Sequence, residues 1–161
     1  MCGIAGVVSI TPFPNALGIE QTLHRMARLI AHRGPDGSDI WHDSHAGLAH
    51  TRLAIIDLSE AGRQPMHDVQ GHYVLTYNGE IYNYRELREE LRAAGHHFRT
   101  ETDSEVILNG YREWGEAVVD RLRGMFAFAL WDEREKRLFM ARDRVGQKPL
   151  FFARFGEVFL F

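Results

Sequence analysis

The chain begins with MCGIAGVVS, residues 1–9. Residues 3–9 form a short apolar segment with β-branched side chains, which predicts a buried strand. If Met1 is removed, Cys2 carries both a thiol and a free α-amino group, and such an amine can act as a general base near neutral pH. A nucleophile activated by its own amine is a known variant of the nucleophile–base pair. Cys2 also fits the simpler interpretation of a small hydrophobic residue at the start of a strand, so a catalytic role needs support from the rest of the chain.

The apolar pattern changes its period several times along the chain, which predicts mixed α and β structure. Apolar residues at helical spacing predict a helix over 19–30 that ends before the turn GPDG at 34–37. Capping boxes at 83–86 and 102–105 predict two more helices. Further strands are predicted at 46–50, 53–57, 73–78, 125–132, 137–143, 150–154 and 157–161.

The composition narrows the class of protein. The 161 residues carry a formal charge of −3, with 45% hydrophobic and 25% charged residues, which indicates one globular domain. Nucleic acid and anionic membranes favour clustered Lys and Arg, so neither is expected as a partner. The longest apolar run, residues 125–131, is far shorter than the ~20 residues that span a bilayer, and no secretory signal is visible. The one cysteine excludes an internal disulfide, and we expect a cytoplasmic protein.

Three further groups could assist a nucleophilic cysteine, and each has a plainer interpretation. Asn78-Gly79 offers a side-chain amide and a backbone N–H to an oxyanion, although Asn-Gly is also the commonest hairpin turn. Arg52 could clamp a carboxylate or could be an ordinary salt-bridged arginine. Asp103 lies in the first turn of a predicted helix, where the helix dipole favours an acid in any case. The nine histidines lack metal-ligand spacing and no phosphate-binding glycine loop occurs, so no metal or nucleotide site is predicted.

Taken in order, these features resemble a known family. The matching segments are MCGIAGV (1–7), HRGPDG (32–37), HTRLAIID (50–57), QPM (64–66), YNGEIYNY (77–84), TDSEVIL (102–108), LRGMFAFALWD (122–132), RDR (142–144) and GQKPL (146–150). Over nearly its whole length the chain resembles the glutaminase domain of glutamine-dependent asparagine synthetases, which are class II (N-terminal nucleophile) glutamine amidotransferases. The RGPD and NGEIYN segments favour this group over the class II members that feed purine or hexosamine synthesis.

The resemblance implies an α+β fold, a four-layer αββα sandwich of two antiparallel sheets between helical layers. It also implies an enzyme that hydrolyses L-glutamine to glutamate and ammonia without a cofactor or metal in this domain. Cys2 would be the nucleophile and its amine the base, while Asn78 and the Gly79 N–H would form the oxyanion hole. Arg52 would bind the α-carboxylate of glutamine, and Glu80 and Asp103 would accept hydrogen bonds from its α-ammonium.

In the family, a C-terminal synthetase domain uses ATP and Mg²⁺ to activate aspartate and then captures the ammonia, which makes the whole protein a ligase. The pyrophosphate loop of that domain, Ser-Gly-Gly-x-Asp-Ser, does not occur in residues 1–161. We therefore expect one amidotransferase domain over 1–161, truncated at its C-terminus. Its expected partners are L-glutamine and the synthetase domain of the same protein, and a homodimer is left open.

The sequence leaves three alternative functions open. A related amidotransferase could feed another acceptor, in a natural-product or exopolysaccharide pathway. A degenerate domain could serve as a scaffold, but the intact Cys2 argues against this. A different N-terminal nucleophile hydrolase would not need Arg52 and Asp103, which suit an amino-acid substrate.

Overall fold

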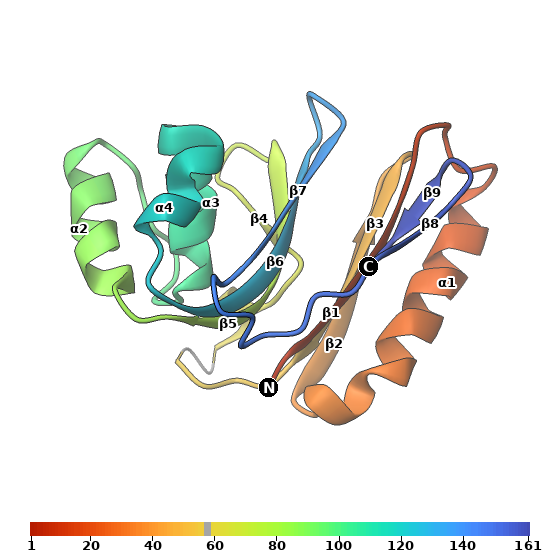
Figure 1. Ribbon diagram of the computed structural model, residues 1–161, viewed down its shortest axis with the longest axis horizontal. Coiled ribbons are helices and arrows are strands. Elements are labelled where there is room, and N and C mark those ends of the chain that lie inside the picture. The colour runs from red at the N-terminus through yellow and green to blue at the C-terminus, as the bar shows by residue number, and fades with distance from the viewer. Residues whose placement is uncertain (57–58) are drawn as a thin grey trace.

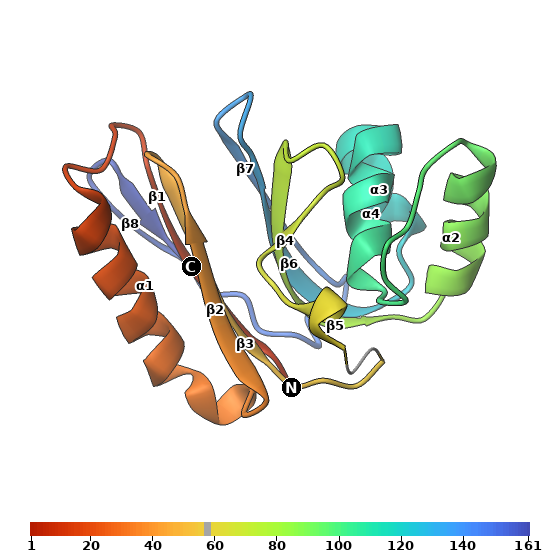
Figure 2. The same ribbon diagram turned by 180° about the vertical axis from the view of Figure 1, so that it is seen from behind.

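The computed structural model describes residues 1–56 and 59–161 as two antiparallel sheets that face each other, with a helical layer outside each sheet. In Figure 1, α1 (Ala16–Leu29) covers the outer face of the first sheet, and α2 (Tyr84–Ala93) and α3 (Ser104–Trp114) lie outside the second. Figure 2 shows the same four layers from behind. The predicted α+β, four-layer αββα sandwich is therefore confirmed. Within the described ranges, no helix is long and apolar enough to cross a membrane.

The first sheet contains the first strand of the chain in an internal position, in the order β2-β3-β1-β9-β8. Its strands are β1 (Gly3–Ser9), β2 (Gly37–His42), β3 (Ala46–Arg52), β8 (Ala153–Phe155) and β9 (Val158–Leu160). The β1–β3 pairing begins with Gly3 opposite Thr51. On its other edge, β1 pairs with β9. Because Gly3 starts this internal pairing, Cys2 lies where β1 enters the sheet, beside the end of β3.

The second sheet has the order β4-β5-β6-β7 and is built around β5. Its strands are β4 (Met66–His67), β5 (Tyr73–Ile81), β6 (Gly124–Asp132) and β7 (Arg137–Arg142). Side chains alternate along a strand, and on β5 Leu75 and Tyr77 belong to the core beneath α2 and α3. Val74 instead packs against the first sheet, and the Thr76 hydroxyl donates to the carbonyl of Ala49 on β3. The even-numbered positions of β5 therefore face the first sheet.

The helices begin close to the predicted residues, but neither predicted capping box forms. The Asn83 side chain does not cap α2 and instead bonds the backbone of Arg121 and Arg123. At α3, the Asp103 side chain makes no cap hydrogen bond, because it points to β5. The Glu105 carboxylate accepts from the backbone N–H groups of the preceding loop rather than closing a box. The remaining helical segments are η1 (Ala31–Arg33), η2 (Glu60–Gly62), η3 (Gly115–Ala117) and α4 (Val118–Arg121).

Three strand predictions differ from the structure. The strand predicted at 53–57 is absent over 53–56, and its last residue lies outside the described ranges. The backbone N–H groups of Leu53 and Ala54 bond the Cys2 sulfur and the Asp36 carboxylate, so they are not available to a sheet ladder. The edge strands β2 and β4 were not predicted. The pair predicted at 150–154 and 157–161 is confirmed as the shorter pair β8–β9.

One carboxylate joins the two sheets at the end away from Cys2. Asp43, between β2 and β3, accepts from the indole N–H of Trp131 on β6 at 3.0 Å and from the Lys136 ammonium at 2.8 Å. Burial alone would raise the pKa of Asp43, but the hydrogen bonds from Lys136 and from the backbone N–H groups of His45 and Ala46 outweigh it. The pKa therefore lies below its usual value of 3.8.

We expect Asp43→Ala to lower the free energy of unfolding by about 1–3 kcal/mol, because it leaves the Trp131 N–H without an acceptor between the sheets. The exposed Glu135, in the nearby β6–β7 turn, provides the control Glu135→Ala. Because the folded-state pKa of Asp43 is depressed, its contribution is present above pH 3.8 and is lost as the pH falls through the folded-state pKa. Denaturant unfolding at neutral and acid pH measures the difference. Equal losses in the two variants would contradict this role.

Candidate active site

The Cys2 thiol is held at the junction of β1 and β3. Its sulfur accepts from the backbone N–H of Leu53 at 3.3 Å and faces the carbonyl of the same residue at 3.6 Å. The Cys2 carbonyl accepts from the Arg33 Nε at 3.1 Å. The residue is partly exposed, so its thiol is both positioned and accessible.

A pocket of about 200 Å³ opens at this junction and lies between the two sheets. It brings together all six residues that the sequence singled out: Cys2, Arg52, Asn78, Gly79, Glu80 and Asp103. They come from four separate segments of the chain, namely the residue ahead of β1, the end of β3, β5 and the residue ahead of α3. The sequence order of these residues does not explain their proximity, so the convergence is a property of the fold.

The strand β5 supplies three consecutive residues of the pocket. Asn78 and Glu80 occupy even-numbered positions and therefore face the first sheet, where Cys2 lies. Asn78-Gly79 is not a hairpin turn, because both residues lie inside β5, opposite Ala127 and Phe126 of β6. A Cβ on Gly79 would collide with the carbonyl oxygen of Met125 and with the Cα of Phe126. Glycine is needed here so that the backbone can come this close to β6.

Asp103 approaches the pocket from the helical side of β5. Its Oδ2 accepts from the Tyr77 hydroxyl at 2.6 Å and from the Ile81 N–H at 2.9 Å. Burial raises the pKa of Asp103, the hydrogen bonds from Tyr77, from Ile81 and from its own backbone N–H lower it, and the nearby charge of Glu80 raises it further. The net direction is upward, as expected for a carboxyl with only 6% of its surface exposed.

Arg52 ends β3 at the rim of the pocket. Its guanidinium donates to the carbonyl of Ser59 at 2.9 Å, which fixes one edge of the planar group. The residue is partly buried and lines the pocket. This placement agrees with a group that presents a fork of N–H donors to an anion.

Several pocket residues were not identified from the sequence. The Gln64 side chain accepts from the Tyr77 N–H at 2.6 Å, and the buried Lys148 ammonium donates to the Met1 sulfur at 2.8 Å. Lys148 belongs to GQKPL and Gln64 to QPM, two of the segments that carry the resemblance, and this was the one sequence feature that pointed to them. In the described part of the chain, no group of three or more His, Cys, Asp or Glu residues could hold a metal ion.

His50 lines the pocket as a neutral ring. Its Nε2 lies 3.2 Å from the Tyr77 carbonyl, and since a carbonyl can only accept, Nε2 carries the proton. Burial, aided by the charge of Arg52, lowers the pKa of His50 to about 4, and the Tyr77 contact only partly opposes this. At neutral pH, His50 therefore connects the two sheets without adding a charge beside Cys2.

Comparison with known proteins shows the family of this chain. A family model described as a glutamine amidotransferase domain matches residues 1–161. Asparagine synthetase (glutamine-hydrolyzing) 3 of Bacillus subtilis is 49% identical, over 100% of this chain and 26% of its own length. Amidase chry2 of Gibberella zeae is 41% identical, over 94% of this chain and 24% of its own length. The chain thus spans about a quarter of the length of these relatives.

A solved structure supports the same fold. Glutamine phosphoribosylpyrophosphate amidotransferase from Bacillus subtilis superimposes with a TM-score of 0.80 over 99% of this chain and 41% of that chain, at 18% sequence identity. This chain therefore shares its fold with that protein. With the family model matching every residue, the chain belongs to the glutamine amidotransferase domain family.

Proposed function

We propose that this chain hydrolyses L-glutamine to glutamate and ammonia, with Cys2 as the nucleophile. The observation that supports this most is the convergence of a partly exposed thiol, an Asn-Gly pair inside a strand, an arginine and a buried carboxylate on one pocket. A pocket of about 200 Å³ suits a small amino acid rather than a large ligand.

The reaction assigns a task to each group at the reacting end of the substrate. The Cys2 thiolate attacks the carbon of the side-chain amide, and the resulting oxyanion accepts from the Asn78 amide and the Gly79 N–H. The Cys2 α-amine, freed by removal of Met1, accepts the proton of the thiol and passes it through a water to the leaving nitrogen. Ammonia departs, and water hydrolyses the γ-glutamyl thioester to glutamate and regenerates the thiol.

The other end of the substrate is bound by charge. Arg52 pairs with the α-carboxylate, and Glu80 and Asp103 accept from the α-ammonium. Arg52 comes from the end of β3, whereas Glu80 comes from β5 and Asp103 from the residue ahead of α3, so the pocket offers opposite charges to the two groups on the α-carbon of glutamine. Such contacts exist in the ground state and in the transition state alike, so they govern binding more than the chemical step.

We further propose that the chain is the glutaminase part of a longer asparagine synthetase. The 49% identity to a protein of that name supports this, and the synthetase domain of the same polypeptide would use the ammonia to amidate aspartyl-AMP with ATP and Mg²⁺. Residues 1–161 contain no phosphate-binding glycine loop, so ATP would bind to the synthetase domain alone. The single cysteine suits the cytoplasm as the proposed compartment. One alternative is an amidotransferase that feeds another acceptor, because a relative with 41% identity is named an amidase and not an asparagine synthetase.

Two substitutions separate chemistry from binding. We expect Asn78→Ala to lower kcat by about 10²–10³-fold, as for the loss of one oxyanion donor. We expect Asp103→Asn mainly to raise KM for glutamine, because it weakens an ion pair present before and during the reaction. Steady-state glutamate release measures both. An Asn78→Ala protein with a raised KM and an unchanged kcat would show that the oxyanion role is wrong.

The role of Cys2 is tested in the complete protein. We expect Cys2→Ala to abolish glutamine-dependent asparagine synthesis and to leave synthesis from free ammonia intact, since only amide hydrolysis needs the thiol. The matched control is an exposed substitution remote from the pocket, Glu135→Ala. If a folded Cys2→Ala protein lost glutamine-dependent and ammonia-dependent synthesis equally, Cys2 could not act in glutamine hydrolysis alone. The unmodified protein could hydrolyse glutamine and still fail to make asparagine from ammonia, aspartate and ATP. That result would favour an amidotransferase whose acceptor is not aspartate.

A further inference from the structure

Tyr77 makes a buried contact that the proposed mechanism does not use. The residue lies on β5 directly before Asn78, with 3% of its surface exposed, and its ring belongs to the core beneath α2 and α3. Its hydroxyl nevertheless donates to Asp103 Oδ2 at 2.6 Å and the residue lines the pocket. Burial and the adjacent Asp103 charge raise the pKa of Tyr77 well above its usual value. The phenol therefore stays protonated and acts as the donor.

The two hydrogen bonds that β5 donates to Asp103 end on the same oxygen. Tyr77 OH and Ile81 N–H both end on Oδ2, so neither uses Oδ1. Within residues 1–56 and 59–161, no Lys, Arg or His nitrogen lies within 4.0 Å of the Asp103 carboxylate. A buried carboxylate is costly without a cation or hydrogen bonds. Here the two hydrogen bonds from β5 support Oδ2, and none of the residues that the structure describes provides a cation partner on the side of the pocket.

We propose that Tyr77 is a positioning residue for recognition of the substrate α-ammonium. By occupying Oδ2, its hydroxyl turns Oδ1 toward the ligand and helps to keep Asp103 ionised. The inference rests on the proposed glutamine hydrolysis. It assigns to the Tyr77 hydrogen bond the task of orienting Asp103 to bind an amino group. It predicts that the pocket selects ligands with an amino group largely through this phenol–carboxylate pair.

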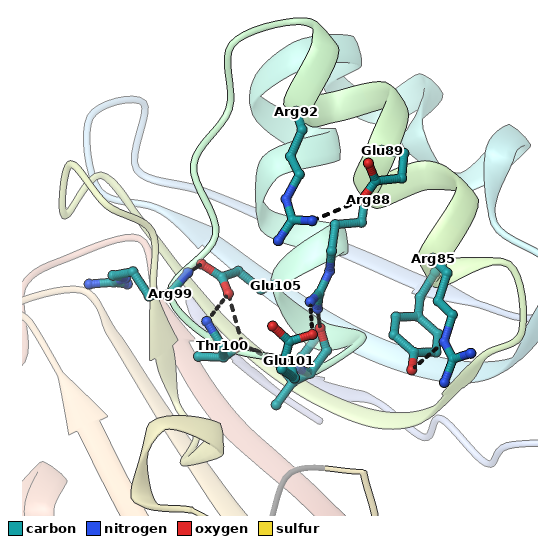
Figure 3. Close-up of polar contacts among 11 residues, drawn as sticks. Arg85, Arg88, Glu89, Arg92, Arg99, Thr100, Glu101 and Glu105 are labelled. Carbon is teal, nitrogen blue, oxygen red and sulfur yellow. Dashed lines mark hydrogen bonds and ion pairs between the residues drawn. The ribbon is translucent and has the colours of Figure 1, made fainter.

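The backbone around Asp103 is held independently of Tyr77, so removal of the hydroxyl does not release the loop. Figure 3 shows Arg88 of α2 pointing at this loop, where its guanidinium bonds the Glu101 carboxylate at 2.5 Å and the Thr102 carbonyl at 2.8 Å. The Glu105 carboxylate of α3 accepts from the N–H and the hydroxyl of Thr100 in the same loop. The effect of Tyr77 on the Asp103 side chain can therefore be measured with the main chain fixed.

The same contact gives a pH signature. The hydrogen bond from Tyr77 lowers the pKa of Asp103, whereas burial and Glu80 raise it. Glutamine binding needs the ionised carboxylate, so KM should rise as the pH falls through the pKa of Asp103. Loss of the Tyr77 hydroxyl raises that pKa further, and the rise in KM then begins at a higher pH. The other titratable or charged groups that face this region are Cys2 ahead of β1, His50 and Arg52 on β3, Arg88 on α2, Glu105 on α3, and Lys148 after β7.

The test compares Tyr77→Phe with Tyr73→Phe, which removes a hydroxyl from another odd-numbered position of β5 outside the pocket. We expect Tyr77→Phe to raise KM for L-glutamine about tenfold, the loss of one hydrogen bond to a charged group, with kcat changed less than about twofold. The acid limb of the KM profile should move to higher pH. Tyr73→Phe should leave both quantities unchanged.

Two further measurements guard against a merely structural effect. In the Asp103→Asn background, Tyr77→Phe should have little additional effect on KM, because the two residues act as one unit. In the Cys2→Ala protein, calorimetry should show that Tyr77→Phe weakens the binding of L-glutamine. The binding of glutaramate, which is glutamine without its amino group, should be unchanged.

A wild-type KM and pH profile in Tyr77→Phe, with Asp103→Asn still raising KM, would overturn the inference and leave the proposed function standing. If Tyr77→Phe weakened the binding of L-glutamine and of glutaramate equally, the inference would also be overturned. If the unmodified protein released no glutamate from glutamine, the proposed function itself would be wrong.

Discussion

The alternation of side chains along β5 is the constraint on which the pocket depends. Tyr77 points to the helical side, where Asp103 arrives ahead of α3, while Asn78 and Glu80 point to the first sheet, where Cys2 lies. Between them, Gly79 has no room for a Cβ against β6. A register slip of one residue would exchange the two faces and place Tyr77 beside Cys2. The pairing of β5 with β6 along its full length makes such a slip costly.

The pairing of β1 with β3 holds the first residues of the chain in place. Chain termini are ordinarily poorly ordered unless they are tied down. Here residues 3–8 pair with β3, and Cys2 is fixed by the N–H of Leu53 and by Arg33. The buried Asp103 lacks a cation in the described part of the chain, so the pocket carries an electrostatic cost that a bound ammonium would offset.

The sequence predicted the elements better than their hydrogen bonds. Apolar periodicity identified β1, α1, β3, β5 and the β6–β7 pair, because these elements bury one regular face. The layer order came from the family resemblance, since periodicity does not reveal which faces meet. Local motifs misled where a tertiary partner took over their polar groups. Asn78-Gly79 lies inside a strand rather than in a turn, and Asp103 bonds Tyr77 rather than the N-terminus of its helix.

The six candidate site residues all line one pocket, but their neighbours were not predicted. Tyr77 and Leu53 were hidden because an apolar strand pattern gives no indication that a phenol or a backbone amide will find a polar partner across the fold. Lys148 is far away in sequence and reaches the pocket only through packing.

A crystal structure of the Cys2→Ala protein with L-glutamine tests the central claim most directly. We expect the amide carbon next to residue 2 and the amide oxygen within hydrogen-bonding distance of Asn78 and the Gly79 N–H. We expect the α-carboxylate on Arg52 and the α-ammonium on Asp103 Oδ1. Glutamine bound in the reverse direction, or bound outside this pocket, would contradict it.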